Sequence, residues 1–400
     1  MVFQVGESAD VVVVGGGTVG GWCAWFLARS GLGRVVLIDK SRLGQGASSR
    51  AAGMVRGQGG TETAVKLGMW AIDFYEHQPE LLGLDSGFVR QGYFMPAFDD
   101  QQVSEAKARI AMQRDVGLEV DWLDETQVAA LNPTMARDCC LGGSYAPGDG
   151  YIDPPRNVLA YATALVASGV EIREGVTFTG LRSSSGRVTA VETSAGPIAT
   201  GRVVLTGGPE LADVGRIGGV GIPAGGVRHQ VAVTEPCPQL SPEGHPMVFD
   251  VAAGLYWRPE DGGILFGMSN PAEPPGVARD VDWDYMDLMR DRLGALVPGT
   301  RELRLRRTWA ATIDFTPDHL PILGPALHDG GFIEGTTVAS AGGHGMMWGP
   351  AVARVAADLC ADSKTDLLDV SDLGLDRFDD EGNSRLVPDP IALPFPGKLR

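Results

Sequence analysis

The sequence predicts an α/β fold that begins with a parallel strand–helix–strand unit. Residues 10–14 form a valine-rich run, which is typical of a strand buried on both faces. A glycine-rich turn follows, and the next segment carries large apolar residues at helical spacing up to Ser30. A second strand is predicted over residues 34–38 and ends at Asp39. This order of elements is that of a Rossmann-type unit.

The turn between the first strand and the helix has the pattern GxGxxG, with glycines at 15, 17 and 20. We expect Gly15 to permit the tight turn, Gly17 to let the backbone approach a pyrophosphate, and Gly20 to let helix and strand pack closely. The helix N-terminus offers unpaired N–H groups and a partial positive charge to phosphates. Asp39 is placed to accept hydrogen bonds from the ribose hydroxyls. The alternative is a purely structural turn, but the complete unit favours dinucleotide binding.

The segment after Asp39 favours FAD over NAD. Residues 40–53 form a loop of small and polar residues, which can run beneath a long, flat cofactor and donate backbone N–H groups to its pyrophosphate. An NAD site has no need of such a loop at this place. Two more glycine-containing segments come late, at residues 316–324 and 341–350, and the second is expected to open an apolar helix that extends through Leu359.

Seven motifs follow one another in the order found in one known family. They are GGGTVG, GASSRAAG, DGYIDPPRNVLAYATALVASGVEI, RHQVAVTEP, YWRPEDGGILFG, TPDHLPILGP and GGHGMMWGPA. On these motifs the chain resembles the D-amino-acid oxidase superfamily of FAD enzymes, in the branch of sarcosine oxidase and dimethylglycine dehydrogenase. The resemblance extends from about residue 10 to residue 378.

The resemblance implies a Rossmann-type FAD-binding domain interleaved with an α+β substrate-binding domain, whose mixed β-sheet covers the flavin. The FAD-binding domain would comprise residues 1–84, 149–220 and 305–378, and the substrate-binding domain residues 85–148 and 221–304. Local patterns predict strands over residues 170–178, 187–191, 202–205, 227–234 and 254–268, and helices over residues 101–117 and 280–297. Residues 379–400 are expected to form an extended tail that could pack on a neighbouring molecule, without a chemical role.

The resemblance and the glycine pattern together give a set of residues expected to hold FAD. From the turn, the strand end and the loop these are Gly15, Gly17, Thr18, Val19, Gly20, Asp39, Lys40, Ser41, Gly46, Ala47, Ser48, Ser49, Arg50, Ala52, Gly53 and Met54. From later segments they are Val176, Thr206, Gly207, Gly208, Gly324, Gly343, His344, Gly345 and Met346. The last four would lie where the helix after Gly345 points its N-terminus at the flavin, which favours the anionic reduced ring.

His344, Tyr256 and Arg56 are the candidate catalytic residues. His344 either faces the substrate or flavin edge, or orders its loop through a hydrogen bond. Tyr256 matches a family tyrosine on the strand that covers the substrate, and the alternative is a core or rim tyrosine. Arg56 lies near the place of a family arginine that binds the substrate carboxylate; otherwise it binds a phosphate or a neighbouring acid. His229 is expected to be a packed sheet residue, and Arg258 a member of a surface ion pair.

The chain departs from its relatives where they attach FAD and bind substrate. Arg50 stands where the dimethylglycine dehydrogenase type has its FAD-linking histidine, and residues 308–311 lack the linking cysteine of monomeric sarcosine oxidases. FAD is therefore expected to be bound non-covalently. Met347 replaces a lysine that binds the substrate carboxylate, and Leu265 or Phe266 replaces a lysine that assists oxygen activation. A more apolar pocket, open to a bulkier amine than sarcosine, is the consequence.

Composition limits the classes of partner. The net charge of −17 argues against binding to nucleic acids or anionic membranes. The five cysteines show no CxxC spacing, so they suit a reducing compartment; adjacent Cys139 and Cys140 are expected to be a buried or turn pair, and no metal site is predicted. With no signal peptide and no apolar run near the ~20 residues that span a bilayer, a cytoplasmic location is expected.

The predicted function is FAD-dependent removal of a hydride from the carbon next to nitrogen in a small amine or amino acid, giving an imine that hydrolyses. Candidate substrates are secondary or tertiary N-alkyl amines and D-amino acids. The electron acceptor would be O2, a protein or a quinone, and an oligomer is left open. Two alternatives remain: oxidation of a 2-hydroxy acid or related alcohol on the same fold, and a flavin-carrying subunit of a larger redox complex.

Overall fold

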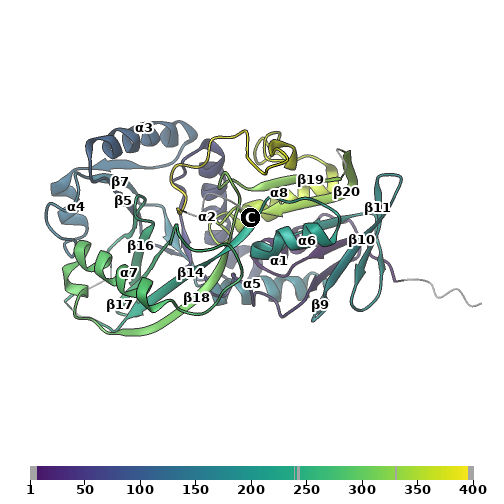
Figure 1. The fold of residues 1–400 in the computed structure, drawn as a ribbon, viewed down its shortest axis with the longest axis horizontal. Coiled ribbons are helices and arrows are strands. Elements are labelled where there is room, and N and C mark those ends of the chain that lie inside the picture. The colour runs from purple at the N-terminus through teal and green to yellow at the C-terminus, as the bar shows by residue number, and fades with distance from the viewer. Residues whose placement is uncertain (1–6, 238, 241–243, 329–330, 395–400) are drawn as a thin grey trace, which may run out of the picture.

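Two β-sheets lie side by side and divide the molecule into two lobes (Figure 1). The computed structural model describes residues 7–237, 239–240, 244–328 and 331–394. Each sheet draws strands from separate parts of the chain, so the lobes are interleaved in sequence. A small third sheet has the order β3-β8-β4, with β3 Met54–Val55, β8 Gly150–Tyr151 and β4 Val89–Arg90.

The nine-stranded sheet carries the predicted Rossmann-type unit. Its main path has the order β10-β11-β20-β13-β1-β2-β9, with β12 paired to β11 and β19 to β20. β1 lies between β13 and β2 and runs parallel to both. The strands are β1 Val11–Val14, β2 Val35–Asp39, β9 Glu171–Glu174, β10 Phe178–Ser184, β11 Arg187–Thr193, β12 Ile198–Ala199, β13 Val203–Leu205, β19 Ile322–His328 and β20 Gly331–Ser340.

The valine run of β1 is buried on both faces, as the sequence predicts. Val11 and Val13 belong to the core that includes residues of four helices, α1 Thr18–Arg29, α2 Glu62–Leu82, α5 Pro154–Ala167 and α8 Gly349–Asp362. Val12 and Val14 belong to a second core, which includes Leu211 of α6 (Leu211–Ile217). Successive side chains of a strand point to opposite faces, so a central strand between two cores needs an unbroken apolar run.

The eight-stranded sheet forms the other lobe, with the order β18-β14-β17-β16-β15-β5-β7-β6. It is mixed, because β15 and β5 are parallel while the other pairs are antiparallel. Its strands are β5 Tyr93–Pro96, β6 Asp121–Leu123, β7 Gly143–Ala146, β14 Gly225–Thr234, β15 Met247–Asp250, β16 Leu255–Glu260, β17 Gly263–Met268 and β18 Leu305–Phe315.

Three helices lie in this lobe: α3 Asp100–Val116, α4 Glu125–Leu131 and α7 Trp283–Leu296 (Figure 1). Met286 and Met289 of α7 pack into the core beneath the sheet. β18 pairs with β14 along its length, so residues 305–315 belong to this sheet, although our proposed domain division places them in the FAD-binding part. None of the helices in the described part of the chain combines the length and apolar character that crossing a bilayer demands.

Several predicted elements have different bounds. The strand predicted over residues 170–178 is two strands, because Gly175 adopts a φ of 74° and turns the chain between β9 and β10. α7 begins only at Trp283, since the Asp282 side chain caps it by accepting from the Tyr285 N–H. The helix expected after Gly345 begins four residues later, at Gly349, and residues 345–348 form turns instead.

A buried ion pair fastens the C-terminal part of the chain to the turn between β18 and β19. Arg377 Nε lies 2.7 Å from Asp318 Oδ2, and both side chains are fully buried. Ser384 Oγ donates to the same oxygen at 2.6 Å. Burial opposes ionisation of Asp318, but Arg377 and Ser384 outweigh it and hold the pKa of this carboxyl below its ordinary value.

We predict that Asp318→Ala lowers the free energy of unfolding by about 3–5 kcal/mol, because it leaves the buried Arg377 guanidinium unpaired. The pair stabilises the fold above the unfolded-state pKa of Asp318, and its contribution is lost as pH falls through the lower folded-state value. Chemical denaturation should therefore show that the difference in free energy of unfolding between wild type and Asp318→Ala is smaller in acid than at pH 7. The control Asp372→Ala removes an exposed pair with Arg385 and should cost less than about 1 kcal/mol; equal losses would contradict the prediction.

Candidate active site

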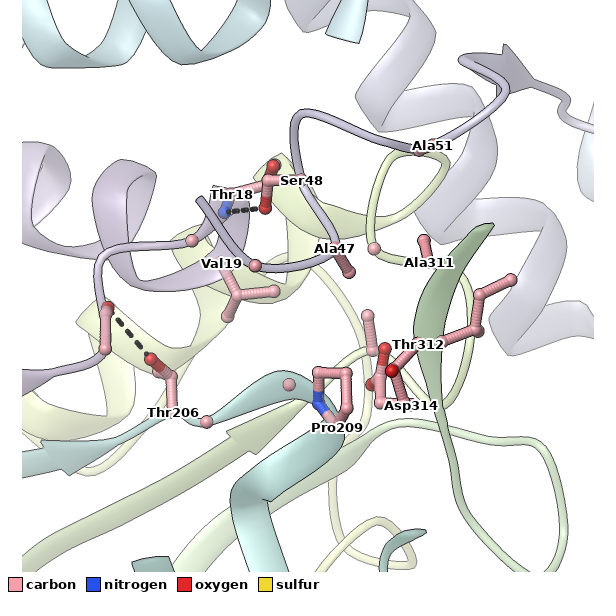
Figure 2. A pocket seen from close by; sticks show the side chains of 18 of the residues that line it. Thr18, Val19, Ala47, Ser48, Ala51, Thr206, Pro209, Ala311, Thr312 and Asp314 are labelled. Atoms are coloured by element: carbon pink, nitrogen blue, oxygen red, sulfur yellow. Dashed lines mark hydrogen bonds between the residues drawn. The ribbon is translucent and has the colours of Figure 1, made fainter. Parts of the chain in front are cut away.

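A cavity of about 650 Å³ lies where the two sheets meet, and we call it the central cavity. The predicted FAD-binding residues that line it are Gly15, Gly17, Thr18, Val19, Gly20, Asp39, Lys40, Ser41, Gly46, Ala47, Ser48, Arg50, Ala52, Gly53, Met54, Val176, Thr206, Gly207, Gly208, Gly343, His344, Gly345 and Met346. Figure 2 shows Val19 and Ala47 on one side of it and Thr312 and Asp314 of β18 on the other. The three candidate catalytic residues line it too.

The glycine turn is held by contacts that leave no room for side chains. Gly15 has a φ of 102°, and a Cβ there would lie 2.7 Å from the Thr206 carbonyl oxygen. A Cβ on Gly20 would lie 1.8 Å from the Gly15 carbonyl oxygen, so α1 packs directly on the end of β1. Thr206 Oγ1 donates to the Val14 carbonyl at 2.7 Å. Gly15 and Gly20 therefore do what the motif predicts.

The loop after β2 packs against the start of α1. Ser48 Oγ accepts from the Thr18 N–H at 2.9 Å, which Figure 2 shows as a dashed line. A Cβ on Gly17 would lie 3.2 Å from this same hydroxyl, so the turn and the loop approach each other closely there. The result is a narrow backbone cradle at the N-terminus of a helix, which is the arrangement that binds phosphates.

Asp39 ends β2 at the rim of this cradle. Its Oδ2 accepts from the Gly16 N–H and its Oδ1 from the Ser41 N–H, both at 2.7 Å. The carboxylate thus fixes the two backbone segments that border the cavity. Lys40 beside it forms an exposed ion pair with Glu210 at 2.7 Å.

Two predicted FAD-binding residues, Ser49 and Gly324, do not line the central cavity. The Ser49 N–H donates inside its own loop, to the Gly44 carbonyl. Gly324 lies in β19, where a Cβ would come 3.2 Å from the Cα of Gly374. The glycine there is explained by close packing of the chain on itself.

Arg50 also lies at the cavity, but its side chain has a local role. Its Nη1 donates to the carbonyls of Gln45 and Gly46 in its own loop. Arg279, from the loop before α7, lines the cavity as well and was not identified from the sequence. Burial and the Arg279 charge both lower the pKa of Arg50, so the two cations lie near one another at the cofactor side of the cavity.

His344 is buried in the wall of the cavity and has features of both roles considered for it, facing the cavity and ordering its own loop. Its ring stacks on that of Trp348, with centroids 3.9 Å apart, and its backbone C=O accepts from the Trp348 N–H. Burial, and then the charge of Arg56, lower the pKa of His344 well below its ordinary value, so it is neutral at pH 7. Within the described residues its Nδ1 is buried and has no hydrogen-bond partner.

Arg56 is buried at the cavity and bonded to backbone oxygens. Its guanidinium donates to the carbonyl of Gln58 and, at 3.0 Å, to that of Ile391. Over the described ranges no carboxylate lies within ion-pairing distance of it. The nearby Asp149 is fully buried, which raises the pKa of its carboxyl to about 7. The hydrogen bonds of Arg56 within the protein go to backbone carbonyls, so they support neither alternative role, binding a neighbouring acid or a cofactor phosphate.

His229 and Tyr256 form a pair in the wall of the central cavity. The hydroxyl of Tyr256 lies 2.7 Å from His229 Nε2, and the two rings are stacked. Burial lowers the pKa of His229 to about 4 and raises that of Tyr256, so both are neutral at pH 7. The sequence pointed to Tyr256 but left His229 as a packed sheet residue; their adjacency arises because β14 and β16 both pair with β17.

Arg258, two residues further along β16, has a structural role. It forms the expected ion pair, with Glu260 at 2.7 Å, but the pair is mostly buried and does not lie at the surface as predicted. Arg258 Nε also donates to the Ala52 carbonyl at 3.0 Å, so it stabilises the loop of residues 40–53, which we call the cofactor loop.

A backbone cradle at a helix N-terminus, an acid at the end of β2 and a cavity roofed by a mixed sheet define a dinucleotide-binding protein of two interleaved lobes. Comparison with known families narrows this class. Residues 10–359 match the family described as DAO, FAD dependent oxidoreductase. The chain belongs to this family, and FAD is its cofactor.

Several characterised proteins are similar to this chain. Mitochondrial sarcosine dehydrogenase of Mus musculus is 30% identical over 351 residues, which cover 84% of this chain and 38% of that protein. Glycine oxidase of Geobacillus kaustophilus is 28% identical, covering 92% and 97%. The structure of L-proline dehydrogenase from P. horikoshii superposes with a TM-score of 0.83 at 26% identity, covering 91% and 96%. The chain thus spans about two fifths of the length of the mitochondrial dehydrogenases it matches.

The residues present fit FAD. The cradle at Gly17 admits a phosphate because no side chain fills it, and Gly46 and Gly208 have open space where a Cβ would be. From this cradle the cavity lining continues through Ala52 and Met54 to His344. The cavity therefore offers phosphate-binding backbone at one end and an apolar, neutral wall at the other.

We predict that Gly20→Ala weakens FAD binding at least tenfold, because its methyl group would collide with the Gly15 carbonyl and displace the helix N-terminus. Gly201→Ala is the matched control, since a Cβ there meets nothing within 4 Å. Fluorescence titration of the apoprotein with FAD would measure both dissociation constants. Unchanged affinity in Gly20→Ala would contradict the assignment of the cradle.

Proposed function

We propose that the protein oxidises a small amine that carries a carboxylate, at the carbon next to nitrogen. The observation that carries this proposal is the buried Arg56 guanidinium, which lines the central cavity without an ion-pair partner in the described part of the chain. Sarcosine dehydrogenase, dimethylglycine dehydrogenase and glycine oxidase, to which the chain is similar, are named for substrates with both groups on one carbon. FAD, when bound, accepts the hydride equivalent from that carbon.

Arg56 would bind the substrate carboxylate. A buried cation is costly unless it is paired, and a carboxylate can use the donors that the Gln58 and Ile391 carbonyls leave over. Asp149 does not cancel this charge fully, since its carboxyl is partly protonated near pH 7. The binding of an anionic group beside Arg56 therefore satisfies a charge that the fold leaves unpaired.

The pair of Tyr256 and His229 would orient the substrate nitrogen. With the Tyr256 hydroxyl donating to neutral His229 Nε2, a lone pair of the same oxygen remains for an N–H of the substrate. Because the pKa of His229 is about 4, its ring stays neutral at pH 7 and remains an acceptor for the Tyr256 hydroxyl, which holds that hydroxyl in position.

His344 would border the substrate without adding charge. Its low pKa keeps the ring neutral, so it neither repels an ammonium group nor attracts the carboxylate away from Arg56. The neighbouring Met346 and Met347 line the cavity and make this wall apolar. Space for an N-alkyl group at this wall would suit secondary and tertiary amines.

FAD is proposed to be bound non-covalently, since Arg50 and residues 308–311 offer no histidine or cysteine for attachment. All five cysteines are free, and on this basis we place the protein in a reducing compartment, the cytoplasm. The electron acceptor is proposed to be O2 or a protein or quinone.

The test of the function is anaerobic mixing of the purified flavoprotein with N-methyl amino acids, D-amino acids, simple amines and 2-hydroxy acids. Bleaching of the flavin by amino acids but not by hydroxy acids would support the proposal. Reduction of the flavin by hydroxy acids alone would show that the protein oxidises alcohols instead. If no compound reduces the flavin, the result would favour a flavin-carrying subunit of a larger redox complex. Re-oxidation on admitting air then separates oxidase from dehydrogenase.

Arg56→Met should raise KM for carboxylate-bearing amines by about 10- to 100-fold, because it removes one or two charge-assisted hydrogen bonds. Amines without a carboxylate should be affected far less. Arg306→Met, at an exposed pair with Asp261, is the control and should leave KM unchanged. An equal fold-change in KM for both substrate classes in Arg56→Met would contradict a role in carboxylate binding.

Tyr256→Phe should lower kcat/KM by about tenfold near pH 7, since the substrate ammonium loses the hydroxyl oxygen that accepts its N–H. The loss should shrink at high pH, where the substrate amine is already neutral in solution. Rapid-reaction measurement of flavin reduction across pH gives this profile. A loss that is constant with pH would show that the hydroxyl has another role.

A further inference from the structure

The C-terminal segment does not extend away from the molecule, as the sequence suggested for residues 379–400. As far as it is described, it returns to the central cavity. In Figure 1 this segment, drawn in yellow, leaves the lobe that holds β19 and β20 and reaches the lobe that holds β5 and β16. Residues 389–394 end up between the turn that follows β18 and the core that includes Tyr93 and Tyr256. The described part of the expected extended tail therefore packs on the protein's own core.

The first contact of this segment is with Arg56. The Ile391 carbonyl accepts from Arg56 Nη2 at 3.0 Å, and the bond is buried. The Ile391 N–H donates to Asp389 Oδ1 at 3.0 Å, and the Asp389 N–H donates to the Asp318 carbonyl at 3.0 Å. A chain of hydrogen bonds thus runs from the buried Asp318 turn, through Asp389, to the guanidinium in the cavity.

The second contact is apolar. Ile391 is fully buried in the core formed with Tyr93, Phe249 and Tyr256, which all line the central cavity. Leu393 packs on the same core and itself lines the cavity. The segment therefore supplies a side chain to the wall in which Arg56 and Tyr256 lie.

Two glycines elsewhere in the chain admit this segment. A Cβ on Gly60 would lie 2.0 Å from Asp389 Oδ1, and a Cβ on Gly254 would lie 2.7 Å from Pro394 Cδ. Gly254 also has a φ of 66°. Both lobes are thus shaped to receive residues 389–394, which is what a permanent part of the site requires.

We infer that residues 389–394 are the specificity-determining wall of the substrate pocket. Leu393 limits the size of the group that lies beside the substrate carboxylate, and the Asp389–Ile391 turn positions Arg56 through the Ile391 carbonyl. This inference rests on the proposed function, since it takes Arg56 as the carboxylate-binding residue. It assigns part of the site to a segment in which the sequence carries no recognisable motif.

The test uses the holoprotein and two kinds of probe. The first is the dissociation constant of acetate and of 4-methylpentanoate, read from the visible spectrum of the bound flavin without turnover. The second is kcat/KM for sarcosine and for N-methyl-leucine. Each probe gives a ratio between the larger and the smaller compound, one of binding affinity and one of kcat/KM. Leu393→Ala should shift both ratios toward the larger compound by about tenfold, because removal of the side chain leaves space for several methylene groups beside Arg56. Leu393→Trp should shift both ratios the other way.

Asp389→Ala tests the positioning of Arg56. It should raise KM for sarcosine, and the dissociation constant of acetate, by about tenfold with kcat nearly unchanged, since only carboxylate binding depends on the turn. Val387→Ala is the control, because Val387 lies in the same segment and is 82% exposed. A fall in kcat without a rise in KM would overturn the positioning role.

The two proposals fail in different ways. If no amine reduces the flavin but Leu393→Ala still changes the carboxylate size preference, the proposed reaction is wrong and the wall stands. If amines reduce the flavin and Leu393→Ala alters neither ratio, the wall is wrong and the reaction stands. Failure of the wild type to bind either carboxylate would overturn the inference as well.

Discussion

The structure depends on one close approach, that of α1 to the end of β1. Because the Gly15 carbonyl would lie 1.8 Å from a Cβ on Gly20, helix and strand meet at backbone distance and the helix N-terminus is held at the cavity. Thr206 and Ser48 bond to this junction from the neighbouring strand end and from the cofactor loop. Three segments far apart in sequence are therefore arranged around the same few backbone atoms, and together they make the phosphate end of the cofactor site.

The sequence predicted this half of the site well because its determinants are local. A valine run, a glycine pattern and an acid at a strand end specify one supersecondary unit whose geometry is nearly fixed. The substrate half depends instead on strand pairing between distant segments. β14 and β16 both pair with β17, and this pairing brings His229 next to Tyr256. Neither of the two sequence motifs that contain these residues predicts this contact. The start of α7 was misplaced because a single side-chain cap, at Asp282, overrides the helical periodicity of the residues before it.

Electrostatics divides the cavity into two regions of different character. At the cofactor end, backbone N–H groups surround a site suited to a permanent anion, and Arg50 and Arg279 add positive charge. At the substrate end, His229, Tyr256 and His344 are all neutral at pH 7 because burial disfavours their charged forms. Arg56 is then a buried positive charge in a largely neutral part of the cavity. In the proposed function, this single guanidinium would set the orientation of a small zwitterion.

The orientation of a substrate in the proposed site depends on how firmly the protein holds the Arg56 guanidinium. A flexible guanidinium in a cavity would lose much of its binding energy to ordering, whereas one held by buried carbonyls meets the carboxylate in a fixed position. One of these carbonyls, that of Gln58, is two residues away; the other, that of Ile391, comes from the far end of the chain. The turn that presents Ile391 is bonded to Asp318, whose carboxylate is neutralised by Arg377. The buried ion pair that stabilises the fold therefore also holds the turn that supports Arg56, and in the proposed site it would contribute to the position of the substrate carboxylate.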